Sequence, residues 1–141
     1  MNEINHIIPE LFLSISILTL LMIGVFYKNK SNFIYQSSLV VILITFFLII
    51  SSLTDQSYYE FNNTYKIDYF SSIMKSITLI AAFFVMLSSC EYVKIIEINK
   101  IEYPILILSS LLGMMVMISS YDLMVFYIGL ELQSLALYVL S

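Results

Sequence analysis

The chain has 141 residues and a net charge of −4, and 60% of its residues are hydrophobic while only 11% are charged. A soluble domain of this size needs a more polar surface, so lipid must form most of the surroundings of this chain. The apolar residues come in long runs rather than alternating with polar ones, which excludes a membrane β-barrel. The sequence also lacks a basic patch for nucleic acid. We therefore expect an all-α polytopic membrane protein.

The first apolar run predicts a permanent membrane helix, because no lysine or arginine precedes Lys28 as a cleavable signal would require. Pro9 suits a first helical turn, and Glu10 lies beside the positive end of the helix dipole. Four similar runs follow, each near the roughly 20 residues that cross a bilayer. Ser119 and Asp122 have the spacing of a capping box for the last one. The five expected helices, in a single domain, cover about residues 9–27, 33–53, 70–93, 103–119 and 122–141.

The lysines of the connections predict the orientation of the chain. Lys28 and Lys30 lie in the first connection, and Lys94 and Lys100 lie in the third. The N-terminus and the last turn carry no basic residue, and the second connection, residues 54–68, is net acidic. The positive-inside rule then places the N-terminus outside and the C-terminus inside.

Glu131 lies near the middle of the last apolar run, where a charge costs about 2.5–3.5 kcal/mol on insertion scales. On a helix, Tyr127, Ser134 and Tyr138 share its face. Such a stripe of carboxyl, hydroxyl and phenol groups can hold a proton or pass it through ordered water. We expect these four residues to serve proton translocation. The alternative is a structural glutamate that joins helices.

Lys75 is the second candidate, because it lies about five residues inside the third expected helix. One interpretation is structural: its long side chain reaches back to the membrane interface. The other is functional, with Lys75 contributing a positive charge near an ion path or an adjacent subunit. The sequence leaves both interpretations open.

The remaining polar residues predict simpler roles. Asp122 suits the start of a helix, and His6 is a lone histidine without neighbours spaced for a metal site. Cys90 is the single cysteine, and no phosphate-binding or iron–sulfur motif occurs. We expect no metal, bound cofactor or redox chemistry in this chain. Several glutamates are interpreted as solvated interface charges: Glu10, Glu91, Glu97 and Glu102.

Several segments of the sequence resemble subunit 2 of respiratory complex I, the proton-pumping NADH:ubiquinone oxidoreductase. The similar segments are EYPILIL from Glu102, LGMM around Gly113, and GLELQSLALYVL from Gly129. DYFSSIMKSITLIAA in the third expected helix and IIPELFL near the N-terminus also resemble the family's patterns. The resemblance covers nearly the whole chain and is strongest in its last forty residues.

This resemblance implies an N-terminal portion of an antiporter-like membrane-arm subunit. Glu131 would correspond to the family's fifth-helix glutamate, which pairs with a lysine on a later, broken helix. NADH, FMN, iron–sulfur clusters and quinone would be bound elsewhere in the complex. Because the family has many more helices, we expect a split subunit whose remaining half is another polypeptide, with other membrane-arm subunits as further partners.

Amino-acid usage rich in Ile, Tyr, Phe, Asn and Lys is typical of an A/T-rich genome and favours an organelle or a reduced bacterium. We therefore expect the mitochondrial inner membrane, with a bacterial plasma membrane as the alternative. Two functional alternatives also stay open. One is a purely structural membrane subunit of the same complex, and the other is a small free-standing ion transporter.

Overall fold

The computed structural model describes residues 2–27, 31–53, 57–96 and 101–141. Within these residues, five helices are each long and apolar enough to cross a membrane, and two short strands form a hairpin. The helices are α1 (Asn2–Phe26), α2 (Ser31–Ser51), α3 (Tyr69–Ile96), α4 (Glu102–Ser119) and α5 (Leu123–Leu140), and the strands are β1 (Tyr58–Glu60) and β2 (Tyr65–Ile67).

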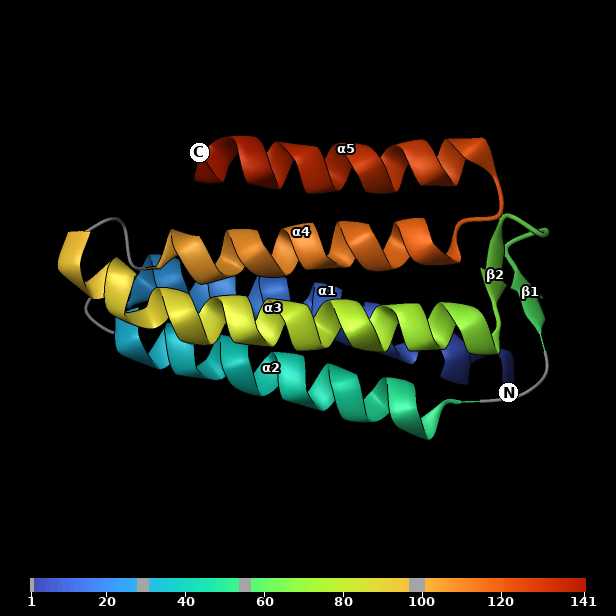
Figure 1. Ribbon diagram of the computed structural model, residues 1–141, viewed down its shortest axis with the longest axis horizontal. Helices are drawn as coiled ribbons and strands as arrows, with labels where there is room; N and C mark the ends of the chain where they lie inside the picture. The colour runs from blue at the N-terminus through green and yellow to red at the C-terminus, as the bar shows by residue number, and fades with distance from the viewer. Residues whose placement is uncertain (1, 28–30, 54–56, 97–100) are drawn as a thin grey trace.

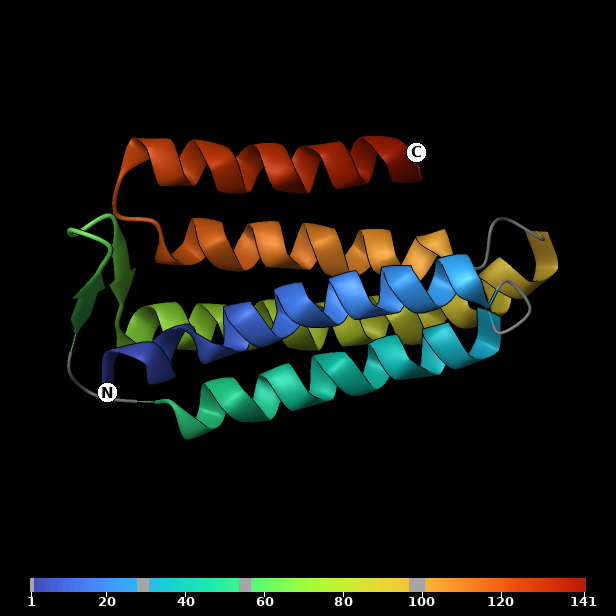
Figure 2. The ribbon, with the colours of Figure 1, turned by 180° about the vertical axis from the view of Figure 1, so that it is seen from behind.

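The first four helices form a bundle (Figure 1), in which α1 packs against α2 and α4, and α3 packs against the same two helices. Figure 2 shows α1 from the opposite side, beside α2 and in front of α3. The buried core residues recur every one or two helical turns, so they form one stripe on each helix. They include Leu13 and Leu20 of α1, Ile34, Ile42 and Ile49 of α2, Leu79 and Met86 of α3, and Leu108, Leu111 and Met115 of α4.

Helix α5 lies outside this bundle and packs on α4 (Figure 1). Only 11% of its membrane-spanning segment is buried, compared with 50% for α4. Its outward residues are large and apolar, as lipid or a neighbouring helix requires. The fifth helix is therefore attached to the rest of the described chain mainly through a single helix neighbour.

The hairpin closes the bundle end at which the N-terminus lies (Figure 1). Tyr58 of β1 pairs with Ile67 of β2, in antiparallel register. Asn62 and Asn63 in the turn have φ angles of 56° and 64°, a conformation that asparagine tolerates better than most residues. The Tyr121 N–H, at the α4–α5 turn, donates a 2.9 Å hydrogen bond to the carbonyl of Thr64. The hairpin thus connects the start of α3 to the start of α5.

Two local expectations were wrong, and one connection contains a structure that was not predicted. Helix α1 begins at Asn2, so Pro9 lies inside the helix rather than in its first turn. The polar connection contains a hairpin, because its aromatic residues pack on the bundle end and the two asparagines form the turn. Asp122 occupies the N-cap position of α5, but its side chain makes no capping hydrogen bond.

The reciprocal capping arrangement occurs instead at the start of α3. The Ser71 N–H donates a 2.9 Å hydrogen bond to Asp68 Oδ1, and the Asp68 N–H donates a 3.0 Å bond to Ser71 Oγ. These two bonds have the pattern of a capping box, with serine in place of the usual glutamate. They hold the first turn of α3, which directly precedes Lys75.

Candidate functional site

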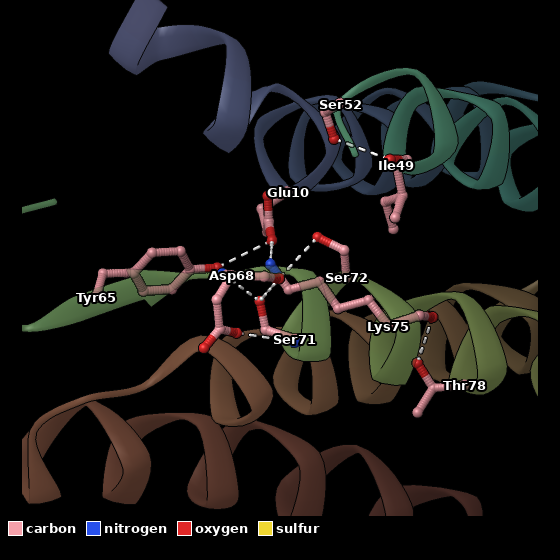
Figure 3. Close-up of polar contacts among 9 residues, drawn as sticks. All are labelled: Glu10, Ile49, Ser52, Tyr65, Asp68, Ser71, Ser72, Lys75 and Thr78. Carbon is pink, nitrogen blue, oxygen red and sulfur yellow. Dashed lines mark hydrogen bonds and ion pairs between the residues drawn. The ribbon is translucent and has the colours of Figure 1, made fainter. Parts of the chain in front are cut away.

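Lys75 of α3 and Glu10 of α1 form an ion pair inside the bundle (Figure 3). The Lys75 ammonium donates to Glu10 Oε1, and only 3% of Lys75 and 7% of Glu10 is exposed. Glu10 lies four residues after the start of its apolar span and Lys75 six residues after the start of its own. At 1.5 Å per residue, both groups lie about 6–9 Å from the hairpin ends of their spans. Similar depth allows the two side chains to meet directly.

Tyr65 of β2 is the third member of this site. Its hydroxyl donates a 2.9 Å hydrogen bond to Glu10 Oε1, the oxygen that also accepts from Lys75. The Lys75 ammonium lies 5.4 Å from the centroid of the Tyr65 ring, within cation–π range. Burial, followed by the negative charge of Glu10, raises the pKa of Tyr65 well above its ordinary value. Tyr65 is therefore a neutral hydrogen-bond donor that caps the ion pair.

Asp68 fixes the backbone that carries Lys75. Besides capping α3, its carboxylate forms a 3.0 Å ion pair with Lys66 of β2. Burial acts to raise the pKa of Asp68, but hydrogen bonds from Ser71 and the charge of Lys66 outweigh burial and lower it. The Asp68 carboxylate is thus charged at neutral pH, and it connects the hairpin to the first turn of α3.

The ion pair decides against one of the two open interpretations of Lys75 and corrects the expectation for Glu10. Lys75 does not extend to the membrane interface, because its ammonium is enclosed by Glu10 and Tyr65. Glu10 is not a solvated border charge, since α3 and the hairpin cover it. A signal for the pair existed in the sequence: two opposite charges lie at similar depth in two apolar spans.

Glu131 lies half-buried on α5, two residues after Gly129, where α5 meets α4. The Tyr127 phenol lies one helical turn before Glu131 and interacts electrostatically with its carboxyl group. The Ser134 hydroxyl instead donates a 3.1 Å bond to the backbone carbonyl of Glu131, and Tyr138 is 74% exposed. The carboxyl–phenol part of the expected stripe therefore forms within this chain, while Tyr138 faces away from the bundle. Lys75 pairs with Glu10, not with Glu131.

No protein-family model matches the chain. The chain is similar to bacterial proteins named NADH-quinone oxidoreductase subunit N. It is 55% identical over all 141 residues to the protein of Pelagibacter ubique, covering 30% of that protein. The identity is 38% to the Paramagnetospirillum magneticum protein and 39% to the Bartonella bacilliformis protein, over 99% and 96% of this chain and 28% of each relative.

The chain thus spans about 30% of the length of the curated relatives that it matches. The predicted similarity to a subunit of NADH-quinone oxidoreductase is confirmed. The finer expectation of subunit 2 is corrected, because these relatives carry the name subunit N. They are also bacterial, so they give the expected mitochondrial location no support.

Proposed function

We propose that this chain is a portion of a membrane-arm subunit of NADH-quinone oxidoreductase and contributes to proton translocation coupled to quinone reduction. The observation that carries the proposal is the 55% identity to a subunit N protein across the whole chain. The five apolar helices fit such a membrane subunit. NADH, the redox cofactors and quinone would be handled by other parts of the enzyme.

Glu131 is the residue to which we assign a protonation role. A carboxyl group in the middle of a spanning helix is costly unless it faces protein or water. The Tyr127 phenol accompanies it, and Ser134 lies one turn further along the same face. Tyr138 extends the stripe toward the outer side of α5. Lys75, by contrast, is committed to Glu10 and does not supply the positive partner of Glu131.

The outward face of α5 is the surface on which we expect further helices of the same subunit to dock. It carries Leu135 and Tyr138, and both are well exposed. Relatives more than three times the length of this chain contain enough additional sequence to cover it. We expect the lysine partner of Glu131 on those helices. The split-subunit hypothesis places them on a second polypeptide, and other membrane-arm subunits would adjoin them.

Purification under native conditions tests this assembly. A tag on the chain should recover a large complex that oxidises NADH with a quinone acceptor, together with the polypeptide that carries the additional helices. The intact mass of the tagged chain in that complex decides between a split subunit and a longer polypeptide. Recovery of this chain only as a small homo-oligomer would contradict the proposal and favour a free-standing transporter.

For location, we propose the bacterial plasma membrane, because the compared relatives are bacterial. For orientation, the lysine pattern favours an external N-terminus, which would place the hairpin outside as well. A Tyr59→Cys variant in a Cys90→Ser background tests this orientation, because Tyr59 is exposed on the hairpin. A membrane-impermeant thiol reagent should label it in intact cells. Labelling only after permeabilisation would reverse the orientation.

A further inference from the structure

His6 and Glu10 lie one helical turn apart on α1, so their side chains share one face of the helix. Both are more than nine-tenths buried, with His6 8% exposed. The His6 ring stacks on the ring of Tyr58 with centroids 4.3 Å apart. The hairpin therefore covers both groups, with Tyr58 of β1 over His6 and Tyr65 of β2 bonded to Glu10.

Glu10 and His6 each have one buried polar atom without a hydrogen-bond partner among the described residues. Glu10 Oε1 accepts from both Lys75 and Tyr65. Within the described part of the chain, Glu10 Oε2 and His6 Nδ1 are buried and have no hydrogen-bond partner. A buried polar atom that stays unpaired destabilises the fold, so each of these two atoms favours a state in which it gains a hydrogen bond. One is a carboxylate acceptor and the other belongs to an imidazole, which becomes a donor at both nitrogens when it takes up a proton.

We propose that His6, Glu10 and Lys75 form a proton-binding site in which Glu10 exchanges a proton with His6 and thereby switches its ion pair with Lys75. In one direction, the proton moves from Nδ1 of the His6 imidazolium to Glu10 Oε2. The products are a neutral imidazole and a neutral carboxylic acid. The Lys75 ammonium keeps its proton but loses its counter-charge, so the site as a whole gains one proton, which enters at His6.

Among the side chains that the structure describes, few charged and titratable groups surround Glu10. Helix α3 contributes Lys75, and Asp68 lies at its start in the ion pair with Lys66. The hairpin contributes Tyr58 and Tyr65. From α4 the neighbouring polar group is the Ser119 hydroxyl, which is buried near Tyr65 and, like Glu10 Oε2, has no hydrogen-bond partner among the described residues. Asp55, before the hairpin, lies outside the described residues. Tyr65 stays neutral because burial raises its pKa, which leaves His6, among the side chains that the structure describes, as the group from which Glu10 can take a proton.

The proposed site at His6, Glu10 and Lys75 is separate from the polar residues around Glu131. The experiment that tests it uses the isolated full chain rather than the assembled enzyme. Its outcome is therefore independent of whether the assembled enzyme translocates protons through Glu131. The full chain in lipid bilayers is followed by infrared difference spectroscopy after a jump to acidic pH. All variants carry Glu131→Gln, which removes the half-buried carboxyl group in the middle of the span of α5.

We expect the C=O band of a protonated, buried carboxyl group to rise after the jump, and Glu10→Gln to abolish it. Because His6 is the single histidine, nitrogen-15 labelling of histidine reports on this residue alone and should show its protonation. Removal of a positioned proton donor slows transfer at least about tenfold, so His6→Gln should slow the rise of the band by at least that factor. An unchanged rate in His6→Gln, or a band that persists in Glu10→Gln, would overturn the proposal.

A folding control accompanies these variants, because Glu10→Gln leaves Lys75 charged and unpaired. The double variant Glu10→Gln/Lys75→Met removes both charges and should retain the helical circular dichroism of the parent chain. It should also lack the carboxyl band. A folded double variant that still shows the band would assign it to another carboxyl group and overturn the proposal. Glu102→Gln, at the exposed start of α4, is the matched control and should leave both the band and its rate unchanged.

Discussion

Gly113 of α4 and Gly129 of α5 bring their two helix backbones into direct contact. A Cβ atom added to Gly113 would lie 2.8 Å from the carbonyl oxygen of Gly129 and 2.8 Å from the backbone nitrogen of Gln133. Small residues permit this approach between membrane helices. Because α5 packs on α4, the two glycines set the position of Glu131.

Replacing Gly129 with alanine should separate α4 from α5, because the added methyl group would meet backbone atoms of Gly113 and Met117 at 3.0 Å. Overpacking of this kind costs about 1–3 kcal/mol. The free energy of unfolding, measured by detergent denaturation, should fall by that amount. Gly24→Ala is the comparison, because its new contacts, 2.6 Å to Ile101 and 3.5 Å to Ile34, are with side chains and none is with a neighbouring backbone. Equal losses in both variants would contradict a special role for the glycine pair.

The Glu10–Lys75 pair should behave as a coupled unit. Removing one partner of a buried ion pair costs about 3–5 kcal/mol, whereas replacing both with apolar residues of similar volume is often neutral. We expect Lys75→Met to be strongly destabilising and Glu10→Met/Lys75→Met to recover most of the loss. A double-mutant cycle on the free energy of unfolding measures this coupling. Additive losses would mean that the two charges do not interact.

Tyr65→Phe removes the hydroxyl that bonds to Glu10 and should cost about 1.5–3 kcal/mol, the usual range for a hydrogen bond to a charged group. Burial raises the pKa of Tyr65 in the folded chain, while an unfolded tyrosine ionises near pH 10. Its contribution is therefore complete below about pH 10 and is lost as the pH rises toward the folded pKa. The stability difference between parent and variant should be constant up to about pH 10 and narrow as the pH rises from about 10 to 11. A constant difference across this range would contradict the buried, neutral phenol.

Asp68→Ala should destabilise the start of α3 by about 0.5–2 kcal/mol, because the cap bonds with Ser71 are lost. The matched control is Asp122→Ala, since Asp122 holds the same position at α5 but makes no side-chain cap bond. The pKa of Asp68 is lowered in the fold, so its stabilisation is present above about pH 4 and is lost as the pH falls further. Urea or detergent titrations at neutral and acidic pH compare the two variants. Equal effects at neutral pH would refute the assignment of the cap.

The five helices could be predicted from the sequence because each apolar run is long enough to cross a membrane and the lysines mark the connections. The hairpin could have been predicted from its two asparagines, which lie between aromatic and β-branched residues. Its contact with the α4–α5 turn could not, because Thr64 and Tyr121 meet only after two helices have packed between them. Short sequence patterns do not indicate which residues far apart in the chain will be in contact.

The interpretation of Glu10 failed for the same reason. A carboxylate near the start of an apolar run is equally compatible with a solvated end and with a buried ion pair. Its partners, Tyr65 and Lys75, lie 55 and 65 residues further along the chain. Glu131 was easier to single out, because a carboxylate in the middle of an apolar run has no solvated alternative. Its expected neighbours follow from helical spacing, and the Tyr127 contact is local.

The central claim, that this chain contributes to proton translocation through Glu131, is tested most directly by Glu131→Gln in the assembled enzyme. The measurement is the number of protons moved per NADH oxidised in sealed vesicles, with Glu102→Gln as the control for a change of one charge. We predict normal assembly and NADH oxidation with a lower proton ratio in Glu131→Gln, and a normal ratio in the control. An unchanged ratio in a fully assembled Glu131→Gln enzyme would contradict the claim and leave this chain a structural role.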